Sequence, residues 1–188
     1  MVGEARLERL SSGLAPVTPG WFVVSVRDAA WETNAHLGAM CAFEGEEAQF
    51  PHLGINVRVL RRGRTRWLYH AEENQEDFLV LSGECLLIVE DEERLLRAWD
   101  FVHCPPGTAH AFVPTGERPC IIVMTGARST EWPKSLKVVY PRSELALRHG
   151  VGVEAEASSP AEAWAQMGTP AWNLERPDGW DDLPWAHP

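Results

Sequence analysis

The sequence predicts an all-β fold, an antiparallel sandwich or barrel, and two observations support that prediction. Short apolar segments follow one another at regular spacing from about residue 53 to residue 127, with turn-forming residues between them. None of these segments has a helical period of useful length, so alternating β and α units are not indicated. At 188 residues, 45% of them hydrophobic, the chain can bury one sizeable core, and we expect a single domain.

Seven segments of the central region are typical of strands, because they are rich in β-branched and aromatic residues and end at turn signals. In chain order they are INVRVL, TRWLYH, DFLVLSG, ECLLIVE, RLLRAWDFVHC, HAFVP and CIIVMTG. The acidic DEE at 91–93 is the expected tip of a hairpin. Before this region, residues 1–20 suggest little regular structure, and WFVVSV at 21–26 predicts one further strand.

The last third of the chain predicts two short helices and a tail. Ser143 can cap ELALRH, and Ser159 begins a capping box with Pro160 at the first helical position. The tail that follows is rich in proline and tryptophan and has no period. Its tryptophans are too costly to leave in water, so we expect them to clamp the tail onto the barrel or onto a second subunit. They are Trp172, Trp180 and Trp185.

Composition limits the partners of the protein. The chain has 17 Lys and Arg against 27 Asp and Glu, a net charge of −10, which would repel a phosphate backbone, so no nucleic acid is expected. No run of about 18 apolar residues predicts a membrane span, and MVGEARLERL lacks the apolar core of a secretory signal, so we expect a cytoplasmic protein. The basic stretch from Arg58 to Arg66 lacks an aromatic platform. We interpret it as a solvent face, with an anionic small molecule or a partner subunit as alternatives.

The four cysteines lie far apart in the sequence and predict neither a zinc ribbon nor a disulfide framework. Cys85 and Cys120 stand inside apolar runs and are expected to be small core residues. Cys104 precedes a turn beside the residues considered next, so the reactivity of its thiol stays open.

The stretches YHAEENQEDFLVLSGE and WDFVHCPPGTAHAF contain the residues that indicate chemistry. His70 and Glu72 are two residues apart on an extended segment, so both side chains leave the same face. Glu76 follows a bend and can return toward that face, and the turn at 105–107 places His110 at the start of the next strand. In a barrel interior these groups would converge, and they would be costly there unless paired or metal-bound.

The first of these stretches resembles the first motif of the cupin family. His70, Glu76 and Gly83 stand at the positions that the motif expects. Glu72 stands where the second histidine is expected, and Gly63 is one residue away from its usual spacing. The second stretch resembles the second motif of the same family. Its match lies at Pro105, Gly107 and His110, whereas Trp99 replaces a glycine and Pro114 an asparagine.

This resemblance implies a cupin double-stranded β-helix, a jelly-roll-like barrel whose motif-bearing core covers residues 53–127. Residues 1–52 would form an N-terminal extension with a strand, and residues 128–188 a C-terminal extension with short helices. Cupins are often homodimers, so the resemblance also implies a homodimer.

The resemblance further implies one divalent metal ion, with His70, Glu76 and His110 as its ligands and Glu72 as a fourth. With Glu72 in place of a histidine, the donor set favours iron(II) or manganese over copper, while zinc and nickel stay open. Two alternatives remain: Glu72 points away from a three-ligand open site, or it marks a lost metal site. If His103 points inward, it could replace the missing histidine or orient a substrate; otherwise it is a buried, satisfied histidine.

Function is less determined than fold, because the cupin fold supports many activities. The first hypothesis is a metal-dependent enzyme, dioxygenase- or isomerase-like, that acts on a small organic molecule. Glu72 or His103 would then be its catalytic acid or base. The alternative is a non-catalytic cupin that binds a small metabolite and has lost the metal chemistry.

Overall fold

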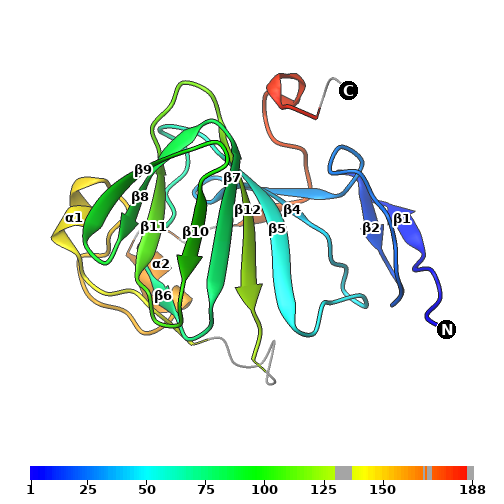
Figure 1. Cartoon of the computed structure of the whole chain (residues 1–188), viewed down its shortest axis with the longest axis horizontal. Coiled ribbons are helices and arrows are strands. Elements are labelled where there is room, and N and C mark those ends of the chain that lie inside the picture. Colours follow the sequence, from blue (N-terminus) through cyan, green and yellow to red (C-terminus); the bar gives the residue numbers. More distant parts are fainter. Residues whose placement is uncertain (130–136, 167, 169–170, 186–188) are drawn as a thin grey trace.

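The computed structural model describes residues 1–129, 137–166, 168 and 171–185. Its largest element is a seven-stranded antiparallel sheet in the order β10-β7-β12-β5-β4-β3-β14 (Figure 1). In chain order these strands are β3 (Trp31–Asn34), β4 (Gly38–Ala42), β5 (Leu53–Leu60), β7 (Glu76–Ser82), β10 (Phe101–Cys104), β12 (Cys120–Ala127) and β14 (Trp172–Asn173). The predicted all-β class is confirmed.

A second sheet has three strands in the order β11-β8-β9. Its members are β8 (Glu84–Val89), β9 (Glu92–Arg97) and β11 (His110–Pro114). Side chains from both sheets share one buried cluster, which is therefore the inside of the barrel. It contains Leu60, Phe78, Val80, Cys85, Leu87, Leu96, Cys104, Phe112, Cys120, Ile122 and Met124.

The other face of the large sheet carries a second core, in which Trp31 is fully buried. The indole of Trp31 stacks on Trp185 at 5.3 Å and meets the edge of Trp180 at 5.7 Å. Trp180 begins the short 3₁₀ helix η1 (Trp180–Asp182). The prediction that tail tryptophans clamp onto the barrel is confirmed for these two, while Trp172 joins the sheet itself as part of β14.

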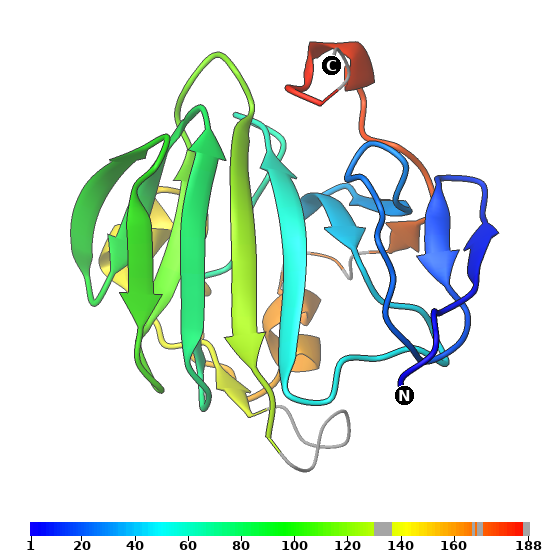
Figure 2. The same ribbon diagram turned by 45° about the vertical axis from the view of Figure 1, so that its right-hand side comes forward.

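Helices α1 (Glu144–Arg148) and α2 (Pro160–Ala165) begin where the capping signals predict. Ser143 Oγ accepts a hydrogen bond from the backbone N–H of Ala146, and Ser159 Oγ accepts one from that of Glu162. Both helices lie behind the long strands in Figure 2, and α1 packs on the outer face of the three-stranded sheet. None of the helices in the described ranges is long and apolar enough to cross a membrane.

Several local predictions are wrong. Residues 1–20 are not unstructured but form the hairpin β1 (Leu7–Arg9) and β2 (Leu14–Pro16). In the segment 21–26 only Trp21 makes a bridge, to Glu4, so the segment is not a strand. The segment TRWLYH forms no strand either, because its backbone bonds to loops, for example from Tyr69 N to Val151 O. β3 and β4, inside the predicted N-terminal extension, are part of the large sheet.

The segment RLLRAWDFVHC is divided into β9 and β10 by a turn at Trp99, and the hairpin tip expected at 91–93 lies at Glu90 and Asp91. All four cysteines are buried and free, as expected for Cys85 and Cys120. Burial raises the pKa of the Cys104 thiol to about 12, which argues against a reactive thiolate there.

Trp99 stands at the motif position of a glycine and keeps the glycine-like backbone, with φ of 76°. The residue is 75% exposed, so its side chain gains little from burial. The left-handed conformation costs an L-residue about 1–2 kcal/mol. We therefore expect Trp99→Gly to be about 1 kcal/mol more stable than Trp99→Ala, measured by urea unfolding. Equal stability of the two variants would contradict this account of the turn.

Candidate metal centre

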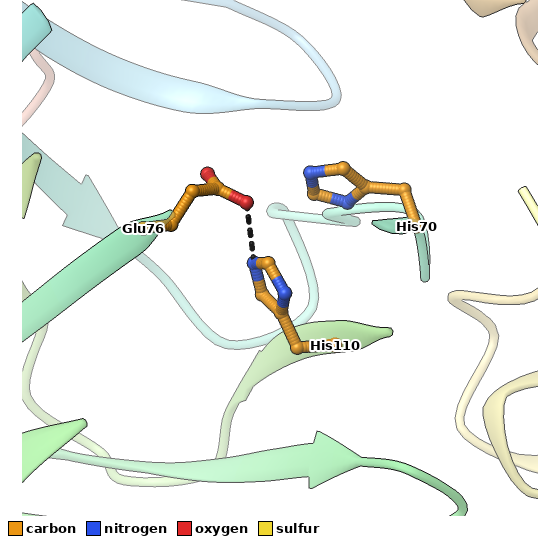
Figure 3. A group of neighbouring side chains, drawn as sticks. All are labelled: His70, Glu76 and His110. Carbon is orange, nitrogen blue, oxygen red and sulfur yellow. Dashed lines mark ion pairs between the residues drawn. The ribbon is translucent and has the colours of Figure 1, made fainter. Parts of the chain in front are cut away.

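Three side chains meet at one end of the barrel interior: His70, Glu76 and His110 (Figure 3). His70 precedes the two-residue strand β6 (Ala71–Glu72), which pairs with β13 (Val138–Val139). Glu76 is the first residue of β7, and His110 is the first residue of β11. The backbones of the two histidines form an antiparallel bridge, with N–O distances of 3.1 and 2.9 Å, which holds them opposite each other.

The distances within this group suit a shared ion. One potential ligand atom from each residue lies within 4.8 Å of those from the other two. His110 Nε2 is 3.6 Å from Glu76 Oε2, and the two imidazole centroids are 4.9 Å apart. These separations exceed hydrogen-bond length, which leaves room for an ion bound at about 2.0–2.2 Å from each donor.

Backbone carbonyls set the tautomers of both histidines. His70 Nδ1 lies 2.8 Å from the carbonyl oxygen of Leu68, and His110 Nδ1 lies 3.1 Å from that of Thr108. A carbonyl only accepts, so each Nδ1 carries the hydrogen and each Nε2 presents a lone pair to the centre. His110 Nε2 is buried and has no hydrogen-bond partner among the described residues. An unsatisfied, oriented lone pair of this kind fits a metal ligand.

The electrostatics favour neutral histidines. Burial lowers the pKa of His70 to about 3, with a smaller effect of the nearby His110, and lowers that of His110 to about 4. Burial also raises the pKa of Glu76 to about 8, and the charge of Glu72 adds to this. Both imidazoles are therefore ready to ligate at neutral pH, whereas Glu76 holds a proton that a cation would displace.

Glu72 lies beside the three residues rather than within their group. Its Oε1 is 4.0 Å from His70 Nε2, and 20% of its side chain is exposed. Burial raises the pKa of its carboxyl group. Glu72 thus points toward His70 at the edge of the three-residue group, and its role as a fourth ligand remains a prediction.

The structure does not bring His103 to this group. His103 lies on β10 between Val102 and Cys104, which pack in the barrel core. The alternation of a strand therefore turns His103 to the outer face, where half of its side chain is exposed. Its Nδ1 is 2.6 Å from Asp77 Oδ1, so the prediction of an inward or a buried histidine is wrong.

Aromatic side chains surround the centre. The ring of Tyr140 is 5.8 Å from that of His70, and Trp67 lies 6.2 Å from it. Phe78 packs against His110 at 5.0 Å. Burial, with Glu72 nearby, raises the pKa of Tyr140 to about 12, so its phenol stays protonated. Tyr140 lies outside the motif region, and nothing in its local sequence signals its position.

A family model described as a cupin domain matches residues 57–126, the part of the chain that supplies the three side chains. Residues 57–126 are a cupin domain. No protein with a curated description matches the sequence. The resemblance of the two motifs to the cupin family is thus confirmed.

Solved structures are similar in fold to this cupin. One is a sugar phosphate isomerase of the cupin superfamily from Silicibacter pomeroyi, with 17% identity over 65% of this chain and 83% of that chain, TM-score 0.53. Another is the polyketide cyclase RemF from Streptomyces resistomycificus, with 16% identity over 62% and 83%, TM-score 0.52. A structure from Acidithiobacillus ferrooxidans is 26% identical over 47% of this chain, TM-score 0.40, and the match spans 54% of that protein.

The raised pKa of Glu76 predicts that metal uptake releases a proton. Below about pH 8 the metal-free carboxyl is protonated, and the ion must displace that proton, so affinity rises about ten-fold per pH unit up to about pH 8 and then levels off. Calorimetry in two buffers of different ionisation enthalpy measures about one proton released at pH 7. Glu76→Gln should release none, whereas the neighbouring, outward-facing Asp77→Asn should behave as the wild type. Proton release on metal binding by Glu76→Gln would contradict the assignment of the released proton to Glu76.

Proposed function

We propose that this cupin is a divalent-metal-dependent enzyme that transfers a proton within a small organic molecule, as an isomerase does. The observation that supports it is the convergence of two oriented histidine lone pairs and Glu76 at a centre where His110 Nε2 has no partner among the described residues. The donors suit iron(II), manganese, zinc or nickel. A divalent ion held by these three ligands would act as a Lewis acid toward a substrate oxygen.

Glu72 would move the proton. Its carboxylate lies at the rim of the centre, 4.0 Å from His70 Nε2, and it is partly open to solvent. The raised pKa brings this carboxyl group toward the range in which a general acid or base works at neutral pH. Tyr140, a neutral phenol near Glu72 and His70, lines the same place and could donate a hydrogen bond to a substrate oxygen.

The experiment that tests this function follows proton exchange, so the product need not be identified. Metal-reconstituted protein is incubated in D₂O with a panel of small hydroxy- and oxo-compounds, including sugar phosphates. Proton NMR then detects deuterium incorporation next to a carbonyl group. Glu72→Gln should keep its metal and lose exchange by about 10²–10⁴-fold. The neighbouring Glu73→Gln, which removes only a surface pair with Lys137, is the control.

The outcomes separate the alternatives. Exchange that depends on both the metal and Glu72 supports the proposal. Binding of a panel compound without exchange would favour the non-catalytic metabolite-binding cupin. Because two histidines and a carboxylate are also the ligand set of non-haem iron oxygenases, metal-dependent oxygen consumption is measured in parallel. Oxygen uptake without exchange would favour the dioxygenase.

A further inference from the structure

Arg58 is a buried arginine that points into the barrel. It pairs with Ile122 of β12, and Leu60, two residues further along β5, faces the core between the sheets. Alternation along the strand places Arg58 on the same face as Leu60. Only 7% of Arg58 is exposed, so the interpretation of the whole basic stretch as a solvent face is wrong at this residue.

Two tryptophans hold the guanidinium group of Arg58. Its central carbon lies 4.5 Å from the ring centroid of Trp67 and 5.3 Å from that of Trp172. The expectation that this basic stretch lacks an aromatic platform is therefore wrong. Trp67 is also 6.2 Å from the His70 ring, so one indole separates Arg58 from the metal centre. Stacking fixes the plane of the guanidinium and leaves its edge for a planar partner.

Among the described residues, no carboxylate forms an ion pair with Arg58; the charge of Glu32 acts on it from a longer distance and raises its pKa against the larger effect of burial. Its Nε donates to Asn56 Oδ1 at 3.1 Å, and within the described ranges no carboxylate lies within 4.0 Å of it. Its Nη1 is buried without any hydrogen-bond partner in the described part of the chain. Burial lowers its pKa to about 9, so it remains charged at neutral pH.

The same fold provides a contrast. Arg128 is also largely buried, and its two terminal nitrogens contact both oxygens of Glu44 at 2.6 and 2.7 Å. A buried arginine without such a pair is costly, because a buried charge is normally paired and hydrogen-bonded. The unsatisfied Nη1 of Arg58 is therefore a feature that a bound anion would complete.

We infer that Arg58 binds the carboxylate group of a small-molecule substrate, whose other end reaches the metal centre. A carboxylate suits the site better than a phosphate, because a planar group with one negative charge matches the planar, singly charged guanidinium that the two indoles hold. The inference rests on the proposed function, since it names the substrate class of that site: small oxo- or hydroxy-carboxylic acids.

The test measures carboxylate binding by calorimetry, with pyruvate and lactate as probes and their amides as neutral counterparts. Metal-loaded wild type should bind the acids at least ten-fold more tightly than the amides. In Arg58→Met the ratio of acid affinity to amide affinity should fall at least ten-fold, while the metal content stays that of the wild type. The variant should also melt no lower than the wild type, because it removes a buried unpaired charge. Arg62→Met, at an exposed arginine of the same stretch, should bind as the wild type does.

Three results would overturn the inference: no preference for acids in the wild type, the same preference in Arg58→Met, or a loss of it in Arg62→Met as well. If Arg58→Met melts at a lower temperature but binds carboxylates as the wild type does, Arg58 stabilises the fold and does not bind substrate. The proposed function fails by a different readout, the absence of metal-dependent deuterium exchange. If the preference for acids depends on Arg58 and persists in metal-free protein, carboxylate binding by Arg58 would be supported even where the proposed metal-dependent activity fails.

Discussion

Replacing His110 with alanine is expected to abolish metal binding, with an affinity lowered by more than about 100-fold. Mutating a residue that only orients a metal ligand typically lowers metal affinity 10–100-fold, and His110 would supply a ligand atom itself. The side chain is 1% exposed and its Nε2 has no other partner among the described residues, so a bound ion would satisfy a lone pair that is otherwise left without a partner. Competition with a chromophoric chelator measures the affinity.

The matched control is His103→Ala. This histidine also lies in the second motif region, but it faces solvent and pairs with Asp77. It should bind metal as tightly as the wild type. Equal loss in the two variants would mean that binding responds to general destabilisation, and unchanged affinity in His110→Ala would remove His110 from the site.

Trp31→Ala is expected to cost about 3–5 kcal/mol of the free energy of unfolding. Trp31 is fully buried, its Nε1 donates to Val26 O, and it is the platform on which Trp180 and Trp185 stack. The loss is a large part of the 5–15 kcal/mol typical of a domain. Urea unfolding measures it, and Trp31→Phe should lose less because part of the stacking remains.

Trp21→Ala is the control for this effect. Trp21 is 53% exposed, and its removal should change stability by less than about 1 kcal/mol. If Trp31→Ala were no more harmful than Trp21→Ala, the tail would not be held to the sheet as described.

The fold class was predictable because strands alternate and turns punctuate them, and both are local signals. The convergence of His70, Glu76 and His110 was predictable because the motifs preserve their spacing, with Glu76 and His110 at the starts of strands. Neither signal depends on how distant parts of the chain pack. The homodimer and the absence of nucleic-acid partners remain predictions.

What could not be predicted depends on register and on distant contacts. His103 faces outward because of how β10 pairs with β7, and a shift of one residue would reverse it. Arg58 looks like its exposed neighbours in sequence, but its burial depends on Trp172, far along the chain. The segment 65–70 looks like a strand because it is apolar, yet Leu68 is buried against the C-terminal segments rather than in a ladder.

Elemental analysis of the wild-type protein, purified without chelator or a histidine tag and then reconstituted, tests the central claim most directly. We expect close to one equivalent of iron, manganese, zinc or nickel per chain, held by His70, Glu76 and His110. Protein that carries no metal after reconstitution with each of these ions would contradict the metal centre and the function built on it.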